Sequence, residues 1–366
     1  MLEKDFIEQA NNLPQSFLNA MISDKNIVIY GGGAACLWYV EWLRGHGIEP
    51  LCIIDSDLRQ KGSYIDSVEI KSMDDVEREF GLYNLCVIIG SPKYKREISE
   101  ILKKWKNVPV YSFETEIYCN FIKDVKMYRK YLLEHYDELD DVYQSLADEK
   151  SRETLDSILK GRITGNQDYF SNVMTLNQYF PDDIISLDEN ETIIEVGAND
   201  GSTLIELLDR LNRKYKRIYC FEPDVKCISI IREKIEKEKD DRIIFIPKGA
   251  GNKEETLYFK TDTEKGASRV VESGDYDYFI QVTSIDKEIS EPISFIKMDI
   301  EGMELEALKG AEKTIKAYKP KLAICVYHNQ EDIIDIPRYI KSLVPTYKMY
   351  IRHHNYGAAE TVLYCV

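Results

Sequence analysis

Thr192-Ile-Ile-Glu-Val-Gly-Ala-Asn-Asp-Gly-Ser202 is the stretch that decides the fold of this chain. An apolar strand is predicted to end at Glu195, and Gly197 and Gly201 bracket a tight turn into a helix that begins near Thr203. Glycine permits close approach of the backbone and positive φ, and the first turn of the helix presents unpaired N–H groups to a carboxylate or phosphate. The stretch therefore predicts a turn that holds a small ligand.

Three more apolar runs extend this unit into alternating strands and helices. The run from 217 to 221 ends in Glu222-Pro223, roughly 20 residues after the glycine turn, where doubly wound folds place an acid for a ribose diol. The runs from 242 to 247 and from 293 to 298 end in Lys248-Gly-Ala-Gly251 and Asp299-Ile-Glu301-Gly302. A ligand of such a sheet lies outside the carboxyl ends of the strands. The residues expected to contact it there are Glu195, Gly197, Asn199, Asp200, Gly201, Glu222, Pro223, Gly249, Ala250 and Asp299.

The motifs EVGANDGS, FEP, KGAGN, GASRV, VTSID and FIKMDIEGMELEALKGA follow one another within residues 165–366. In this order they resemble the FkbM family of S-adenosylmethionine-dependent methyltransferases. Members usually have Asp where this chain has Glu195. The glutamate keeps the carboxylate but places it one methylene group further from the backbone. The resemblance implies S-adenosylmethionine as cofactor and O-methylation of a saccharide, a nucleotide-linked sugar or a related glycosylated metabolite, as in polysaccharide biosynthesis.

The end of the chain separates this fold from a dehydrogenase. The predicted strands at 347–352 and 361–366 are joined by a short turn around Gly357, so the last strand is expected to run antiparallel to the one before it. That arrangement is typical of a class I methyltransferase. For residues 181–366 we therefore predict an α/β fold with a Rossmann-like, doubly wound sheet and an antiparallel last strand.

Residues 1–112 are predicted to form a second Rossmann-like α/β domain, with strands at 27–30, 50–54 and 85–89. Its fingerprint, Gly31-x-Gly33-x-x-Cys36, lacks the third glycine, although Asp55 stands where a ribose acid would. The segment resembles the amino-terminal domain of sugar acyltransferases that bind nucleotide-linked sugars. A nucleotide site and a scaffold that kept only the turn both remain open.

Residues 113–180 have apolar side chains at helical spacing and no run rich in Pro, Ser or Gly, which predicts a helical connector. Such a segment either covers the cofactor site as a lid or packs against the methyltransferase domain.

Histidine is scarce, with five in the chain, yet three follow predicted strands at the edge where Asp299 lies. A hydroxyl is too weakly acidic to attack a methyl group without losing its proton. His328, with a pKa near neutrality, is the expected base, with Asp299 orienting it or the substrate, and His353 is a second catalytic candidate. Alternatively, Asp299 and Glu301 hold Mg²⁺, which would lower the pKa of the substrate hydroxyl. Asp299 could also contact the cofactor while Glu301 caps the following helix.

Three further residues are expected to contact the acceptor. Ser268 and Arg269 belong to Gly266-Ala-Ser-Arg269, and the resemblance places a similar motif near the cofactor or acceptor. A plain turn of a β-hairpin is the alternative. Tyr179, just before the first strand of the methyltransferase domain, is the third.

The net charge of −16 argues against a nucleic-acid partner, since such binders need a concentrated basic surface. No apolar run approaches the ~20 residues that span a bilayer, and the first residues lack the features of a signal peptide, so we expect a cytoplasmic protein without membrane insertion. The eight cysteines form no CxxC pair and are expected to be reduced. A homo-oligomer remains open.

The sequence thus predicts a methyltransferase that acts on a hydroxyl of a saccharide-like small molecule. Two other classes are weighed against it. One is a nucleotide-sugar-binding module whose methyltransferase-like domain is not catalytic, and the intact Gly197, Gly201, Glu222 and Asp299 speak against that loss. The other is an NAD-dependent oxidoreductase acting through residues 27–55, which the missing third glycine disfavours.

Overall fold

The computed structural model describes residues 2–10, 26–33, 35–113, 125–235, 240–262, 267–271, 274 and 276–366, with the backbone alone at 259, 261–262 and 267–270. The chain forms two compact units. The first consists of Met1–Asp137, Glu153–Met174 and Asn355–Ala359, and the second of Glu138–Arg152, Thr175–His354 and Glu360–Val366. The stretch predicted as a separate connector, 113–180, is therefore divided between the units.

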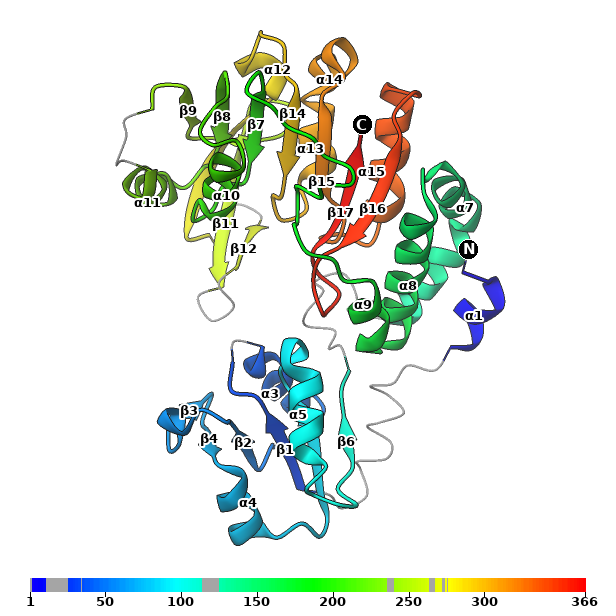
Figure 1. The fold of residues 1–366 in the computed structure, drawn as a ribbon, viewed down its shortest axis with the longest axis vertical. Coiled ribbons are helices and arrows are strands. Elements are labelled where there is room, and N and C mark those ends of the chain that lie inside the picture. The colour runs from blue at the N-terminus through cyan, green and yellow to red at the C-terminus, as the bar shows by residue number, and fades with distance from the viewer. Residues whose placement is uncertain are drawn as a thin grey trace. The chain divides into compact units, whose positions relative to one another are not determined.

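The first unit is built on a six-stranded sheet with the strand order β3-β4-β2-β1-β5-β6 (Figure 1). Its strands are parallel except for β3, which is antiparallel to β4. The central strands β1 and β5 are almost wholly buried apolar runs, as expected where helices cover both faces of a parallel sheet. The strands are β1 (Asn26–Tyr30), β2 (Cys52–Ile54), β3 (Tyr64–Ile65), β4 (Val68–Lys71), β5 (Leu85–Ile89) and β6 (Val110–Tyr111). The helices are α1 (Lys4–Gln9), α3 (Cys36–Gly45), α4 (Met73–Phe80), α5 (Lys95–Leu102), α6 (Val125–Glu134) and α9 (Gln167–Val173).

The glycine turn of the first unit is closed by an acid from its own sheet. Asp55, directly after β2, accepts a hydrogen bond from the backbone N–H of Gly32 at 2.6 Å and one from that of Asp57 at 2.7 Å. Both carboxylate oxygens of Asp55, the residue predicted to bind a ribose, therefore accept hydrogen bonds from the nearby backbone.

The second unit contains a seven-stranded sheet with the order β16-β17-β15-β14-β7-β8-β9. Six strands run in the same direction, and β17 is antiparallel to both of its neighbours, β15 and β16. The predicted antiparallel last strand is thus confirmed, and it lies between the two preceding strands. The strands are β7 (Thr192–Val196), β8 (Arg217–Phe221), β9 (Ile243–Ile246), β14 (Phe295–Met298), β15 (Lys321–Cys325), β16 (Met349–His353) and β17 (Thr361–Cys365).

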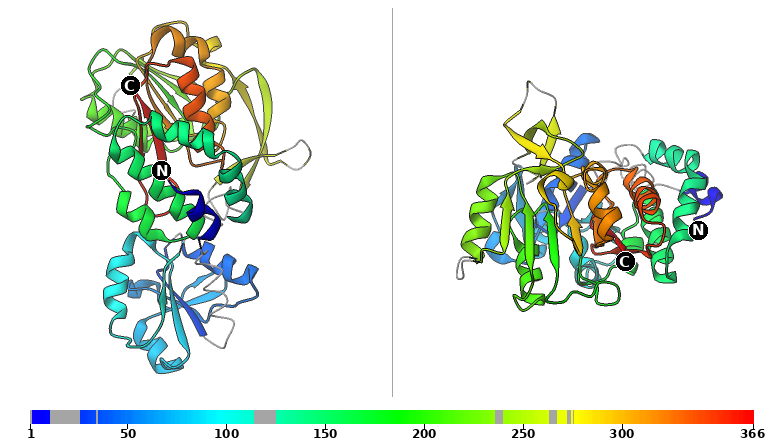
Figure 2. Two further views of the ribbon diagram at one scale, coloured as in Figure 1. Left: turned by 90° about the vertical axis from the view of Figure 1, so that its right-hand side faces the viewer. Right: turned by 90° about the horizontal axis from the view of Figure 1, so that it is seen from above.

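Two sets of helices pack on this sheet. The first is α10 (Ser202–Arg210) and α11 (Val225–Ile235), whose buried leucines and isoleucines form one core with alternate residues of the strands. The second is α13 (Glu304–Lys309), α14 (Glu312–Tyr318) and α15 (Asp332–Leu343), the orange and red helices that lie together in Figure 2. The short helix α12 (Ile285–Glu288) precedes β14.

A smaller sheet is inserted between β9 and β14, with the order β10-β13-β11-β12. Its strands are β10 (Gly249–Ala250), β11 (Glu255–Asp262), β12 (Ala267–Val271) and β13 (Tyr278–Thr283), and β11 and β12 form an antiparallel pair. The backbone of Ser268 and Arg269 lies in β12, but their side chains and Gly266 lie outside the described residues, as does the predicted acceptor contact.

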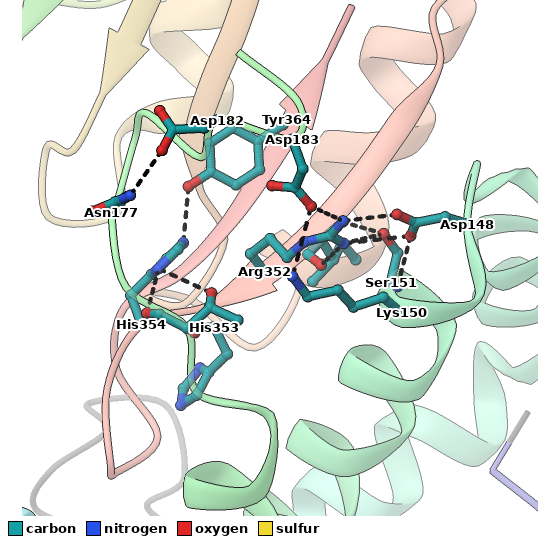
Figure 3. Close-up of polar contacts among 12 residues, drawn as sticks. Asp148, Lys150, Ser151, Asn177, Asp182, Asp183, Arg352, His353, His354 and Tyr364 are labelled. Carbon is teal, nitrogen blue, oxygen red and sulfur yellow. Dashed lines mark hydrogen bonds and ion pairs between the residues drawn. The ribbon is translucent and has the colours of Figure 1, made fainter. Parts of the chain in front are cut away.

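A buried arginine joins the first residues of α8 (Glu149–Thr164) to the sheet of the second unit (Figure 3). Arg352, in β16, is 1% exposed and donates to Asp148 at 2.7 Å, to Ser151 at 2.8 Å and to Asp183 at 3.1 Å. The helix α7 (Tyr136–Ser145) ends just before this cluster. A buried guanidinium is tolerated when its two terminal nitrogens are paired with carboxylates and a hydroxyl in this way.

Within the described part of the chain, no helix is long and apolar enough to cross a membrane. Seven cysteines there have free thiols, and Cys119 lies outside the described residues. The seven are Cys36, Cys52, Cys86, Cys220, Cys227, Cys325 and Cys365.

Candidate functional site

A cavity of about 310 Å³ lies at the carboxyl ends of β7, β8 and β14. Eight of the residues predicted from the sequence line it: Gly197, Asn199, Glu222, Pro223, Gly249, Ala250, Asp299 and Glu301. The remaining walls are largely apolar and come from β8, α11, the inserted sheet and the turn after β14: Val196, Phe221, Asp224, Cys227, Leu257, Tyr278, Ile280, Val282, Ile300 and Met303. An apolar cavity with a few converging polar groups is the usual form of a small-molecule site.

The turn after β7 is packed against the end of β14. Gly197 has φ +81°, and a Cβ on it would lie 1.9 Å from the carbonyl oxygen of Asp299. Its N–H donates to the carbonyl of Phe221 at 3.0 Å. Only glycine fits this position, which brings three strand ends into contact around the cavity.

Glu222 supplies the carboxylate expected for a ribose diol. It is 6% exposed, and its two oxygens accept hydrogen bonds from the backbone N–H groups of Asn199 and Asp224, each at 2.9 Å. Burial raises the pKa of Glu222, and these two hydrogen bonds oppose that shift. Each carboxylate oxygen keeps a second acceptor position. A buried, fixed acid beside apolar walls therefore fits a nucleoside.

Three residues predicted as cofactor contacts do not line the cavity. Glu195 is wholly buried inside the sheet. Asp200 points outward, where it accepts from the N–H of Ser202 at 3.0 Å and pairs with Lys234 at 2.9 Å. Gly201 has φ +80°, and a Cβ there would lie 2.7 Å from Ile231, so this glycine allows α10 to pack on α11.

Glu195 forms an ion pair with Lys297, its neighbour on the adjacent strand. The two side chains are 3.0 Å apart and almost wholly buried, and Lys297 also donates to the carbonyl of Gly197 at 3.0 Å. Burial raises the pKa of Glu195, which Lys297 partly offsets. Glu195 therefore holds Lys297 in place against the glycine turn. Removing either residue of this ion pair would leave a buried charge without its partner.

A cluster of acidic side chains surrounds His328, which lies three residues after the end of β15. Its Nδ1 lies 2.9 Å from Glu304, and its Nε2 lies 3.4 Å from Asp299 and 3.7 Å from Glu301. The structure therefore brings together Asp299, Glu301 and His328, three of the four residues that were predicted to take part in catalysis or metal binding, and His353 is not in this cluster. It also adds Glu304.

Glu304 is a candidate functional residue that was not predicted from the sequence. Its wholly buried carboxylate accepts from the N–H of Ile300 at 2.7 Å and from that of Gly302 at 3.0 Å. A glutamate in the first turn of a helix often caps the backbone before it, so the pattern Glu301-Gly-Met-Glu304 carried a signal for this contact. The backbone bonds leave Glu304 rigidly aimed at His328.

The expected neutral pKa of His328 does not hold in this cluster. Burial disfavours its charged form, but Glu304 above all, and Asp299 and Glu301 with it, outweigh burial and raise the pKa to about 10. Opposite charges within a few ångströms favour the imidazolium. Without a ligand, His328 is therefore protonated at neutral pH.

The donors do not fit the predicted Mg²⁺ site. Asp299, Glu304 and His328 offer ligand atoms within 4.8 Å of one another, whereas the predicted partner of Asp299 was Glu301, whose side chain is 60% exposed. Mg²⁺ prefers oxygen ligands and water. Here a histidine stands at the centre with its Nδ1 2.9 Å from Glu304, so the arrangement fits a cluster of ion pairs better than a magnesium site.

Tyr179 lies behind Asp299, not in the cavity wall. The residue is 5% exposed, and its hydroxyl donates to Asp299 Oδ2 at 2.7 Å. Its φ of +66° lies in the left-handed region, which costs a residue with a bulky side chain about 1–3 kcal/mol. Tyr179, which was predicted to contact the acceptor, instead lies where it holds Asp299, a residue of the cavity wall.

His353 is wholly buried, and its Nδ1 lies 2.9 Å from the hydroxyl of Thr361. It does not line the cavity. His353 and His354 point in opposite directions in Figure 3, and His354 is the one that faces Tyr364.

A larger cavity, about 720 Å³, lies in the first unit between α5, β6 and the start of α9. Of its charged lining residues, Lys95 and Asp168 pair with each other at 2.6 Å, and Lys103 pairs with Glu100. The smaller cavity is the better candidate, because buried and unusually shifted titratable groups converge on it.

Comparisons with known proteins agree with this geometry. Residues 195–356 match the model of the methyltransferase FkbM domain. The chain is similar to the methyltransferase FkbM from Methylobacillus flagellatus KT, with 24% identity and a TM-score of 0.71 over 99% of this chain and 92% of that one.

More distant similarities reach only half of the chain. An rRNA methylase from Streptococcus thermophilus has 14% identity and a TM-score of 0.33, over 54% of this chain and 92% of that one. An O-methyltransferase from Bacillus cereus in complex with SAH has 15% identity and a TM-score of 0.31, over 49% and 74%. No curated protein matches the chain. On the match over residues 195–356, the chain carries an FkbM methyltransferase domain and is an S-adenosylmethionine-dependent methyltransferase.

Proposed function

We propose that this enzyme methylates a hydroxyl oxygen of a saccharide, a nucleotide-linked sugar or a related glycosylated metabolite. The observation that carries the proposal is the placement of His328 Nε2 at 3.4 Å from Asp299, which lines the cavity, with Nδ1 at 2.9 Å from Glu304. A histidine oriented by a buried carboxylate is the usual arrangement of a general base.

The cofactor would be held by the glycine turn and by Glu222. Gly197 gives close access to the backbone at the strand end, and Glu222 offers carboxylate oxygens to a ribose. When bound, S-adenosylmethionine supplies an electrophilic methyl group and a positive charge. The apolar walls from Phe221, Ile280 and Val282 suit the adenine ring.

The proton of the acceptor hydroxyl would pass to His328 Nε2. Glu304 keeps Nδ1 paired, so Nε2 is the nitrogen left to receive it. A positive charge in the cavity that Asp299 lines would lower the pKa of His328 from about 10 toward the range of an effective base. The fraction of His328 in the neutral, proton-accepting form would then be greatest when the site is filled.

The acidic surroundings favour a neutral, hydroxyl-rich acceptor. Asp299 and Glu301 line the cavity and can each accept hydrogen bonds from hydroxyl groups. The same carboxylates would repel a phosphate or carboxylate placed next to them. A saccharide ring, which presents several hydroxyls, meets both conditions.

The test is turnover of variants on nucleotide-linked sugars and free saccharides. His328→Ala should lower kcat about 10²- to 10⁴-fold while affinity for S-adenosylhomocysteine persists, because the base is lost and the glycine turn is not. Asp299→Asn should also lower turnover. His46→Ala, in the first unit, is the control and should keep activity. Near wild-type turnover of both site variants on a confirmed acceptor would refute the proposal.

A further inference from the structure

The hydroxyl of Tyr179 binds one oxygen of the Asp299 carboxylate and leaves the other oxygen to different partners. It donates to Oδ2 at 2.7 Å, while Oδ1 faces His328 Nε2 at 3.4 Å and the hydroxyl of Tyr327 at 3.3 Å. One oxygen is therefore fixed by Tyr179, and the other is turned toward His328 and Tyr327. This division depends on Tyr179 staying in its left-handed backbone conformation.

A hydrogen bond from the neighbouring strand holds that conformation. The N–H of Tyr179 donates to the hydroxyl oxygen of Tyr364 at 3.0 Å, across 185 residues of sequence. Tyr364, in β17, is wholly buried. An L-residue at positive φ persists only when its surroundings compensate the strain, and this is the contact that reaches its backbone.

His354 fixes the direction of the Tyr364 hydroxyl (Figure 3). Its Nδ1 lies 3.0 Å from the carbonyl of Thr175, and its Nε2 lies 2.8 Å from the Tyr364 oxygen. A carbonyl can only accept, so Nδ1 carries the proton and Nε2 accepts from Tyr364. Burial lowers the pKa of His354 to about 4, which keeps it in this neutral form. The Tyr364 oxygen is then left to accept from Tyr179.

We infer that Tyr364, oriented by His354, is a positioning residue that holds Tyr179 so that its hydroxyl fixes Asp299 beside His328. The inference rests on the proposed function only in that Asp299 and His328 serve methyl transfer. It gives His354, and not the predicted His353, a part in the active site.

A double-mutant cycle tests whether Tyr364 acts through Tyr179. Tyr364→Phe should lower kcat about 10- to 100-fold while KM for S-adenosylmethionine stays within about twofold, because a small displacement of Asp299 is enough. Tyr179→Phe should do the same. The kcat of the double variant should be no lower than that of Tyr179→Phe alone. Once the Tyr179 hydroxyl is removed, displacing its ring cannot weaken the contact with Asp299 any further. Losses that multiply would overturn the inference.

Tyr347→Phe is the matched control, because it removes another buried tyrosine hydroxyl of the same unit, one that donates to the carbonyl of Pro320 at 2.5 Å. It should leave kcat unchanged. His354→Gln, which keeps an acceptor near the Nε2 position, should retain more activity than His354→Leu. Equal loss in these two would also speak against the orienting role.

Amide hydrogen exchange at Tyr179 gives a readout that needs no acceptor. Exchange should be faster in Tyr364→Phe than in the wild type and unchanged in Tyr347→Phe. If exchange is unaltered, the positioning role is refuted whatever the reaction. If exchange responds while His328→Ala and Asp299→Asn keep full turnover, the positioning stands and the proposed function fails.

Discussion

At the scale of single residues, Glu304 has the largest effect on the charge of the candidate active site, because it contributes most to the raised pKa of His328. Replacing it by Gln would keep an acceptor for the backbone but remove the main charge that raises the pKa of His328. The pKa of His328 should therefore fall, so the pH at which kcat reaches half of its maximum should move to lower values. We also expect kcat to fall by about tenfold or more, since the imidazole loses its orienting anion. A pH-rate profile measures both effects, and an unmoved profile would contradict this role for Glu304. Glu312→Gln, on an exposed part of α14, is the control.

Glu222 is the residue on which cofactor affinity should depend. Glu222→Gln removes the charge and one acceptor, and hydrogen bonds to charged groups are worth ~1.5–3 kcal/mol each. Affinity for S-adenosylhomocysteine should then fall by about tenfold or more, as measured by calorimetry. Glu206→Gln, on the exposed face of α10, should bind as the wild type does. Equal affinities for both variants would remove Glu222 from the cofactor site.

Sequence spacing was enough for some of these residues and not for others. Glu222 and Asp299 follow strands directly, so strand prediction placed them at the correct edge of the sheet. Tyr364 and His354 act through a contact that spans 185 residues, and only folding brings it together. The pKa of His328 was mispredicted for a similar reason, because it depends on the position of Glu304 after the chain has turned.

At the scale of elements, Arg352 couples the start of α8 to β16. Burial works against the charged form of Asp148, but its hydrogen bonds with Arg352 and Ser151 outweigh it and lower the pKa to about 2, from an ordinary value of 3.8. Its contribution to stability is therefore complete above pH 4 and is lost as the pH falls toward 2. Asp148→Asn keeps the cap on the N–H of Ser151 and removes the charge. In urea unfolding, the free energy of unfolding of Asp148→Asn should be about 1 kcal/mol lower than that of the wild type at pH 7. At pH 3 this difference should be about half as large. A loss that does not change with pH would exclude the ion pair as its cause. Glu149→Gln, an exposed neighbour, is the control.

At the scale of the whole molecule, both units close a glycine turn with the acid that follows the second strand of the Rossmann-like pattern. Asp55 accepts from Gly32 as Glu222 accepts from Asn199, yet only Glu222 also lines the cavity described above. Asp55→Ala should therefore lower the melting temperature while kcat and affinity for S-adenosylhomocysteine stay within about twofold. Thermal unfolding and turnover of the same preparation test this. A large fall in kcat at normal stability would assign the first unit a part in acceptor binding.

The fold was predictable to the extent that local pattern sets it. Buried strands and glycine turns gave the α/β class and the antiparallel last strand, which the sheet order confirms. The insertion of β17 between β15 and β16 and the division of the helices between the units were not predictable, because both depend on which apolar faces meet in three dimensions.

The contact of Gly197 with the Asp299 carbonyl restricts how this enzyme could be redesigned. A library that varies the glycine turn to accept another cofactor will displace the strand end that carries Asp299, and one aimed at the acceptor side will disturb the turn in return. Cofactor preference and acceptor preference are therefore tied to one another by backbone atoms alone. Directed changes in specificity should start from the inserted sheet, whose side chains border the same cavity without bearing on that contact.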